Sequence, residues 1–225
     1  MQEGFFCQPI AHIETDFHEK FGIPRQSGRV EDAVGRVVFL PAYRNPDALR
    51  EITGFSHLWL LFDFSLAHRA GFTPTVRPPR LGGNRHVGVF ASRSPFRPNP
   101  IGLSSVRLLD VAEDGSYLTV AGVDLLDGTP ILDIKPYLPF TDAHPEATAG
   151  YAAEGEGHHL EVRLAEGVTL PAGRVGALIR ACLAEDPRPS YQDDPTRIYN
   201  MALAGMELAF TVAGGVLTVV ALRAK

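Results

Sequence analysis

The segment His57-Leu-Trp-Leu-Leu-Phe-Asp-Phe64 is almost continuously apolar. A short run of this kind, without alternation of polar and apolar residues, is typical of a β-strand. We therefore expect a strand here whose side chains are buried on both faces.

Other short β-type segments surround this strand. They are residues 35–40, 86–91, 103–111, 117–125 and 131–134. Glu113-Asp114-Gly115 separates two of them and is a plausible hairpin turn, while Asn45-Pro46 opens a short helical piece. Because Gly- and Pro-rich turns join these segments with little helix between them, the first 140 residues favour a barrel or a sandwich over a parallel α/β sheet.

A second, smaller unit follows a change in composition. Residues 141–159 are rich in Ala, Glu, Gly and His and resemble a linker. Residues 174–185 carry a helical apolar stripe that stops at Asp186-Pro187. A hairpin is indicated around Ala213-Gly214-Gly215. We predict a mainly β protein with a barrel over residues 1–143 and a small C-terminal α+β domain over residues 144–225.

Positive charge is concentrated in one stretch. Residues 65–108 contain no Asp or Glu but seven arginines and no lysine, whereas the whole chain has 21 basic and 26 acidic residues. Arginine without lysine favours planar, bidentate binding of phosphate or carboxylate. The sequence thus indicates an anion-binding or nucleic-acid-binding surface. The alternative is a set of surface turns whose arginines are solvated or paired with remote acids.

Global properties set further bounds. The chain has 225 residues, 45% of them hydrophobic and 21% charged, as in an ordinary soluble protein of one large domain or one with an appendage. Cys7 and Cys182 lie far apart, which favours a reducing cytoplasm. The N-terminus does not resemble a signal peptide, and no apolar run approaches the roughly 18 residues of a membrane span. We expect a cytoplasmic protein without membrane contact.

Several common catalytic motifs are absent. The chain has neither the glycine pattern of a Rossmann dinucleotide site nor that of a P-loop, and no G-x-S-x-G or H-E-x-x-H. His158-His159 is the only adjacent histidine pair, and a solvated pair is favoured there over a metal site, so we predict no metal.

Two loop segments have candidate binding chemistry. Residues 93–99, R-S-P-F-R-P-N, form a proline-stiffened loop that suits a phosphate or a carboxylate, or simply a tight turn. In residues 124–130, D-L-L-D-G-T-P, an Asp before Gly could accept ribose hydroxyls. It could equally open a type I turn.

Motifs in a fixed order identify a family. They are Pro24-Arg25-Gln26, Phe55-Ser-His-Leu-Trp59, Val76-Arg-Pro-Pro-Arg-Leu-Gly-Gly-Asn84, Gly88-Val-Phe-Ala91, Arg93-Ser94 with Phe96-Arg-Pro-Asn-Pro-Ile-Gly102, and Asp127-Gly-Thr-Pro130 with Asp133-Ile-Lys-Pro-Tyr137. Together they closely resemble the TsaA-like family, the tRNA (adenine-N6)-methyltransferase O enzymes, over roughly residues 5–145. The resemblance continues more weakly through Asp186-Pro-Arg-Pro189 and Tyr191.

The resemblance implies a small β-barrel that binds S-adenosylmethionine without a Rossmann fold, usually as a homodimer. It also implies methylation of N6 of the threonylcarbamoyl-adenosine next to the anticodon of threonine tRNA. The cofactor-binding residues that it implies are Pro24, Arg25, Gln26, Ser65, Leu66, Arg93, Leu103, Leu126, Asp127, Gly128 and Thr129. Relatives often have His at the position of Ser65. The resemblance therefore implies backbone contacts at Ser65 and Leu66 rather than a role for that His side chain.

The arginines are then divided between two anions. One of Arg25 and Arg93 would bind the methionine carboxylate of the cofactor, because arginines do not suit its cationic sulfonium. Arg77, Arg80 and Arg97, with Tyr191 of the tail, are the expected tRNA contacts, and Arg97 is also a candidate for the threonyl carboxylate of the base.

No general base is predicted. All the cofactor residues precede the linker-like segment, so we expect the barrel to bind cofactor by itself. Two other classes fit parts of the sequence: a non-catalytic RNA-binding barrel, and a phosphohydrolase, which would need a metal cluster or nucleophile–base pair that the sequence does not offer.

Overall fold

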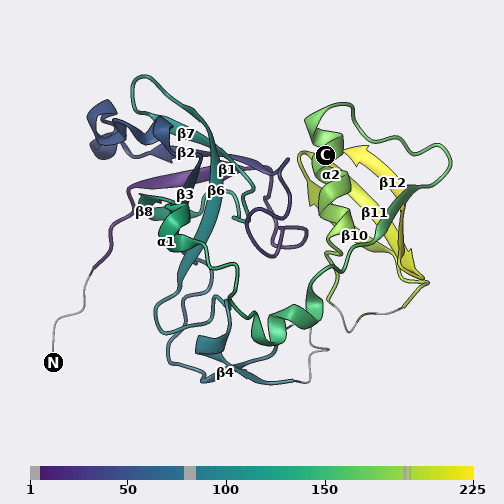
Figure 1. The fold of residues 1–225 in the computed structure, drawn as a ribbon. Helices are drawn as coiled ribbons and strands as arrows, with labels where there is room; N and C mark the ends of the chain where they lie inside the picture. The colour runs from purple at the N-terminus through teal and green to yellow at the C-terminus, as the bar shows by residue number, and fades with distance from the viewer. Residues whose placement is uncertain (1–5, 79–84, 190–191, 193) are drawn as a thin grey trace.

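A computed structural model describes residues 6–78, 85–189, 192 and 194–225. In this part of the chain, strands of the N-terminal half close into an antiparallel barrel in the order β1-β2-β7-β6-β3-β8 (Figure 1). These strands are β1 (Ala11–Thr15), β2 (Val34–Phe39), β3 (His57–Asp63), β6 (Ile101–Val111), β7 (Tyr117–Ala121) and β8 (Pro130–Pro136). The barrel expected from the sequence is therefore confirmed, and the sandwich alternative is not.

Strand β3 occupies the predicted place but is not buried on both faces. Its side chains alternate, with Leu58, Leu60 and Phe62 in the core and the residues between them half-buried. The outer face stays apolar because other segments partly cover it: Trp59 packs on Tyr137 and donates from Nε1 to Asp142 at 2.8 Å. Partial cover of this kind leaves a continuous apolar run that cannot be distinguished by pattern from full burial.

The connections between barrel strands contain only short elements. They are η1 (Pro41–Tyr43), η2 (Pro46–Leu49), η3 (Ile52–Gly54), β4 (Thr75–Val76), β5 (Val87–Gly88) and η5 (Val89–Ala91). The helical piece expected at Asn45-Pro46 is confirmed, because the Asn45 side chain accepts from the Asp47 backbone N–H. The strand expected over residues 86–91 is mostly wrong, since β5 is two residues long and a 3-10 turn follows it.

The C-terminal half is a helix packed on a four-stranded sheet. Its elements are β9 (Glu161–Leu164), α2 (Arg174–Ala184), β10 (Tyr199–Leu203), β11 (Met206–Ala213) and β12 (Val216–Ala224). The predicted helix and the predicted hairpin at Gly214-Gly215 are confirmed. The sheet order is β10-β11-β12-β9, and β9 pairs in parallel with β12, a pairing that the sequence did not indicate.

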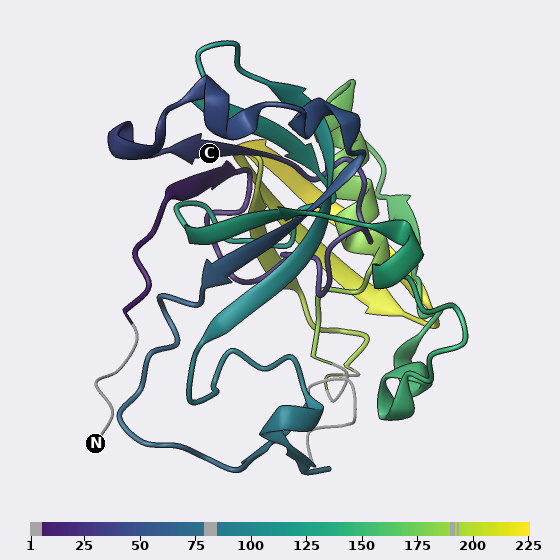
Figure 2. The same ribbon diagram turned by 60° about the vertical axis from the view of Figure 1, so that its left-hand side comes forward.

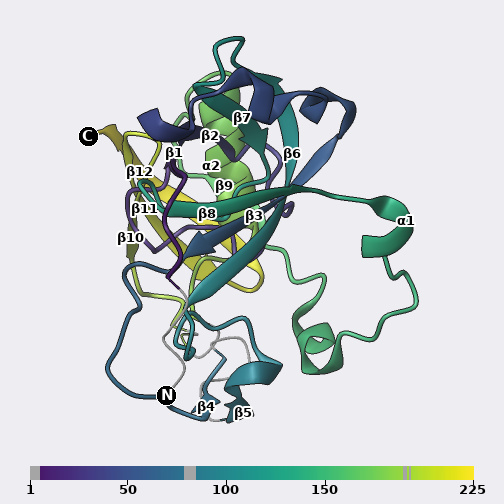
Figure 3. The ribbon, with the colours of Figure 1, turned by 90° about the vertical axis from the view of Figure 1, so that its left-hand side faces the viewer.

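The segment that resembles a linker is folded against the barrel. The helix α1 (Pro139–Asp142) leads into it, and η6 (Gly150–Gly155) within it lies beside the loop around η5 (Figure 3). The Tyr151 hydroxyl donates to the Ala91 carbonyl at 2.9 Å, and Arg85 pairs with Glu154 at 2.7 Å. The segment thus connects the two halves along a defined path.

The two halves pack directly on each other. In the turned view the C-terminal half lies behind the barrel (Figure 2). Phe21, in the loop after β1, stacks on Phe210 of β11 with ring centroids 6.5 Å apart. Gly22 approaches Met201 so closely that a Cβ there would lie 2.4 Å from the Met201 sulfur. The buried side chains of both halves consequently form one continuous core. Among the described residues, no helix is long and apolar enough to cross a membrane.

Candidate functional site

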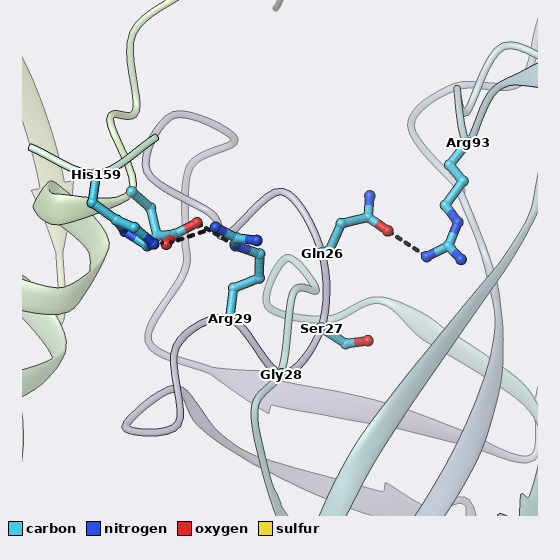
Figure 4. A pocket seen from close by; sticks show the side chains of 7 residues that line it. Gln26, Ser27, Gly28, Arg29, Arg93 and His159 are labelled. Carbon is cyan, nitrogen blue, oxygen red and sulfur yellow. Dashed lines mark hydrogen bonds and ion pairs between the residues drawn. The ribbon is translucent and has the colours of Figure 1, made fainter. Parts of the chain in front are cut away.

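An open cleft of about 510 Å³ lies where the barrel meets the C-terminal half. Its barrel side is the loop of residues 26–29 together with Arg93, and its other side is formed by His159 and Glu185. Figure 4 shows Gln26 pointing from this loop toward Arg93, while Arg29 points the other way, toward His159. The volume falls within the roughly 300–1,000 Å³ of small-ligand sites.

Backbone contacts hold the loop of residues 24–29, hereafter the PRQ loop, against the barrel. The Gly28 N–H donates to the Gly122 carbonyl at 2.8 Å, and the Ser27 hydroxyl accepts from the Ser105 N–H of β6 at 3.2 Å. Gly122 has a φ of 77°, and a Cβ on it would lie 3.1 Å from the Gly28 backbone. The close approach of these two loops therefore depends on a glycine at position 122.

Arg93 emerges from the loop between η5 and β6. The Ser92 hydroxyl donates to the Val89 carbonyl at 2.8 Å, and Arg97 donates to the Ser92 carbonyl at 2.9 Å, so this loop is braced on both sides of Arg93. The Arg93 guanidinium donates to the Gln26 amide oxygen. Arg93 is exposed at the cleft, and within the described part of the chain it forms no salt bridge.

A largely buried carboxylate lies behind this contact. Asp124, in the loop after β7, accepts from the buried Ser104 hydroxyl at 2.6 Å. Burial raises the pKa of the Asp124 carboxyl; hydrogen bonds from Ser104 and from the Ser27 backbone, and the charge of Arg93, lower it less than burial raises it. Asp124 thus joins β6, the PRQ loop and Arg93 electrostatically.

The D-G-T segment forms a turn tied to β1. Asp127 Oδ1 accepts from the Thr15 N–H at 2.9 Å, the Gly128 N–H donates to the Ile13 carbonyl, and the Thr129 hydroxyl donates to the Leu126 carbonyl at 2.7 Å. These contacts agree with the turn interpretation of this segment. They leave Asp127 Oδ2 directed at His18, 3.4 Å away, with the Asp127 side chain about one-third exposed.

Strand pairing brings most of the expected cofactor residues to one end of the barrel. The end of β3 pairs with the start of β6, Asp63 opposite Ile101, and Phe62 pairs with Ile131 at the start of β8. Ser65 and Leu66 follow β3 after one residue, the D-G-T turn directly precedes β8, and the Arg93 loop leads into β6. Leu66 and Leu103 are 66% and 54% exposed, so their side chains are available for contacts outside the core.

Arg25 is the exception among the expected cofactor residues. Its guanidinium donates to the Arg188 carbonyl at 2.6 Å and lies 3.4 Å from the Asp186 carbonyl, both in the C-terminal half. Pro24 beside it is buried. Of the two arginines expected at the cofactor carboxylate, the geometry thus favours Arg93.

The arginines expected to contact tRNA have different surroundings. Arg77 is exposed and donates to His86 Nε2 at 2.9 Å, whereas half-buried Arg97 braces its own loop. Arg80 and Tyr191 lie outside the described residues. Arg85 forms an ion pair with Glu154. For this residue the alternative interpretation, an arginine paired with an acid remote in the sequence, is therefore correct.

The adjacent histidines contact carboxylates. His158 lies 3.0 Å from Asp186 and His159 lies 3.0 Å from Glu185. Burial by itself would raise the pKa of Asp186, but hydrogen bonds from Arg188 and His158 outweigh it and hold that pKa below its ordinary value. In the described ranges, no group of three His, Cys, Asp or Glu side chains could hold a metal ion.

Sequence reasoning did not find Arg29, Glu185 or His159 at this site. Arg29 and Glu185 are 156 positions apart, and neither lies in a recognisable motif. Asp124 begins the D-L-L-D-G-T-P run, which the sequence already indicates as a candidate binding segment. The sequence does not distinguish it from Asp127, because only the fold shows that Ser104 donates to Asp124. A contact between distant single residues leaves no periodicity that a single sequence could reveal.

Barrel and cleft together define a class: a closed β-barrel with a small C-terminal domain and an arginine-bearing site at their junction. Family models match both halves, the tRNA-methyltransferase O N-terminal domain over residues 12–143 and the TrmO C-terminal domain over residues 160–225. The chain belongs to the tRNA-methyltransferase O family.

Individual relatives agree. The chain is 44% identical over 198 residues to a tRNA (adenine(37)-N6)-methyltransferase of Escherichia coli, covering 84% of each protein. It is 50% identical over 175 residues to the enzyme of the same name from Eikenella corrodens, covering 76% of this chain and 98% of the relative. The crystal structure of TrmO from Pseudomonas aeruginosa superposes with a TM-score of 0.80 at 32% identity, covering 99% of this chain and 100% of that one.

Proposed function

We propose that this protein is an S-adenosylmethionine-dependent tRNA methyltransferase acting on N6 of the adenine at position 37, beside the anticodon. The relatives named tRNA (adenine(37)-N6)-methyltransferase support the reaction class. Following the sequence resemblance, the substrate base is N6-threonylcarbamoyladenosine in threonine tRNA. The observation that carries the proposal is Arg93, an exposed arginine that forms no salt bridge among the described residues and is held beside Gln26 at the cleft.

The residues at the cleft fit the proposed cofactor. Arg93 supplies a charge-assisted donor for a carboxylate. The exposed edge of Asp127 supplies an acceptor on the neighbouring surface, as a cationic ligand requires. Leu66 and Leu103 offer apolar surface at the same barrel end. The cofactor set stays the proposed one: Pro24, Gln26, Ser65, Leu66, Arg93, Leu103 and residues 126–129 in contact, with Arg25 acting through the C-terminal half.

The proposed methyl transfer requires mainly that the cofactor and the base be positioned relative to each other. S-adenosylmethionine supplies a methyl group on a positively charged sulfur. Holding the two reactants in line and excluding water accounts for most of the catalysis that such a transfer needs. The N6 proton of the proposed base lies between a purine and a carbonyl and is more acidic than in adenine, so the mechanism assigns no strong general base.

The tRNA is proposed to bind on the arginine-rich segment. Residues 65–108 contain no acidic side chain, and Arg77 is exposed within it. Arg97 stabilises the Arg93 loop by donating to the Ser92 carbonyl. It would contribute to tRNA binding either by holding that loop or by binding the threonyl carboxylate of the base.

A homodimer is proposed from the exposed apolar surface near the same barrel end. Leu66, Ile101 and Leu103 are 66%, 45% and 54% exposed, and Ile101 and Leu103 share the outer face of β6. Clustering of exposed apolar side chains at one end of a barrel is typical of an interface. A second copy on this surface would place the cofactor site beside the subunit boundary.

The decisive experiment is mass spectrometry of tRNA nucleosides from cells with and without this gene. We expect the N6-methylated form of threonylcarbamoyladenosine to disappear with the gene and to return when purified protein and S-adenosylmethionine are added to the isolated tRNA. Unchanged nucleosides, together with tRNA binding but no cofactor binding, would instead identify a non-catalytic RNA-binding barrel.

A further inference from the structure

The C-terminal half reaches the proposed cofactor loop through a buried carboxylate. Glu185, at the end of α2, is 6% exposed in its side chain and accepts both Arg29 Nε at 2.6 Å and Arg29 Nη2 at 3.3 Å. Its Oε1 also lies 3.0 Å from His159 Nδ1. A two-pronged arginine–carboxylate contact fixes orientation as well as distance. Arg29 therefore has its direction set by the other half of the molecule.

A second contact holds the same loop from its other end. Arg25 donates to the Arg188 carbonyl at 2.6 Å. That carbonyl is itself fixed, because Arg188 forms a two-pronged contact with Asp186 at 2.9 and 3.1 Å. The PRQ loop is thus anchored on the C-terminal half at Arg25 and Arg29, and Gln26 lies between these anchors.

Gln26 is the residue whose position this anchoring decides. Its amide oxygen accepts from Arg93 across the cleft, while the backbone at Gly28 is held by the barrel. A loop of six residues, fixed at positions 25 and 29, leaves Gln26 little freedom to leave Arg93. If the anchors are lost, Gln26 and Arg93 are no longer pre-oriented, and the ordering must be supplied when ligand binds.

We infer that Glu185 is a positioning residue for the cofactor site, and that the C-terminal domain forms part of that site by holding the PRQ loop. The inference rests on the proposed cofactor cleft. It replaces the expectation from sequence that the barrel binds cofactor by itself.

The test uses full-length protein and S-adenosylmethionine as the titrant in calorimetry. Glu185→Gln keeps the size of the side chain and removes its charge, and Arg29→Ala removes the partner. We expect each variant to lower cofactor affinity by about fivefold or more, as for a coupling between two sites. The double variant should lose no more than the larger single loss, because both changes break the same link.

Arg174→Ala is the matched control. Arg174 pairs with Asp16 at 2.7 Å, which is also a contact between the C-terminal half and the barrel, but neither residue lines the cleft. This variant should lower the thermal unfolding temperature while leaving cofactor affinity unchanged. Equal losses of affinity in Arg174→Ala and Glu185→Gln would overturn the inference, since they would indicate general weakening of domain packing.

Arg93→Ala separates the inference from the proposed function. If Arg93→Ala lowers affinity and Glu185→Gln does not, the cofactor site stands and the positioning role is wrong. If Arg93→Ala has no effect on a folded protein, the cleft is not the cofactor site, and the positioning role of Glu185 fails with it. As a further readout, Glu185→Gln should raise the KM for the cofactor more than it lowers kcat on tRNA.

Discussion

At Arg93 the surroundings of a single guanidinium separate a binding role from a structural one. The nearby Arg97 donates hydrogen bonds to carbonyls of its own loop, whereas Arg93 contacts the neutral Gln26 amide at an open cleft. We expect Arg93→Ala to weaken S-adenosylmethionine binding by about 1.5–3 kcal/mol, the contribution of a charge-assisted contact. Calorimetry measures it, with Arg223→Ala, an exposed residue paired with Glu207, as the control.

Asp124 is a residue whose charge opposes folding. Burial raises its pKa in the folded protein above the ordinary value near 3.9. The folded state therefore holds the proton more tightly than the unfolded state. This tighter proton binding stabilises the fold fully in acid, and the stabilisation is lost as pH rises through the pKa of the folded state. Asp124→Asn should raise the unfolding temperature at pH 7 relative to the unchanged protein, and this gain should vanish toward pH 4.

Thermal unfolding measured between pH 4 and 8 tests this expectation. The asparagine keeps an acceptor for the Ser104 hydroxyl, so the comparison isolates the charge. A variant that is less stable at every pH would show that the carboxylate contributes net stability, contrary to the direction given by its burial.

At the scale of elements, the barrel depends on a glycine where β6 pairs with β3. A Cβ at Gly102 would lie 2.2 Å from two ring carbons of Phe62, its partner across the strands. Phe62 is buried and packs edge-on against Phe64, so its ring has little room to move. Gly102→Ala should lower the free energy of unfolding by about 1–3 kcal/mol through overpacking.

Denaturant unfolding checks this value. Gly54→Ala in η3 is the matched control, because a Cβ there meets no atom within 4 Å and its φ is not positive. Equal stability of the two variants would mean that β3 and β6 can separate without cost, and that Gly102 is not needed for their contact.

At the scale of the whole molecule, the net charge of −5 opposes tRNA binding, whereas the acid-free arginine segment favours it. Binding should therefore depend on the segment and weaken steeply with salt. Arg77→Ala should reduce the slope of log affinity against log salt by about one unit, as for the loss of one phosphate contact. Filter binding of tRNA across a salt series measures it, and an unchanged slope would place the tRNA elsewhere.

Assembly is a property of the same scale. If Leu66, Ile101 and Leu103 form an interface, the protein should sediment at twice its 24.4 kDa mass. Ile101→Asp should produce a monomer, because it places a charge within that surface. A 24.4 kDa species of the unchanged protein at micromolar concentration, with full cofactor binding, would contradict the dimer.

Local pattern was sufficient for most of the elements. The apolar run of β3, the stripe of α2 and the glycines between β11 and β12 each specify a structure through neighbouring residues alone, and the ordered Pro- and Arg-rich motifs specified the family. The barrel followed because short strands with tight turns have few other ways to bury their apolar faces.

Tertiary structure decided the partners. That Arg25 and Arg29 face the C-terminal half, that Glu185 is buried, and that Asp124 rather than Asp127 lies behind Arg93 all depend on segments far apart in the chain. The partial cover of the outer face of β3 likewise depends on α1, which follows about 80 residues later in the chain. Periodicity reports only how a residue relates to its neighbours, whereas the direction and charge state of a site are set by whatever the fold places opposite it.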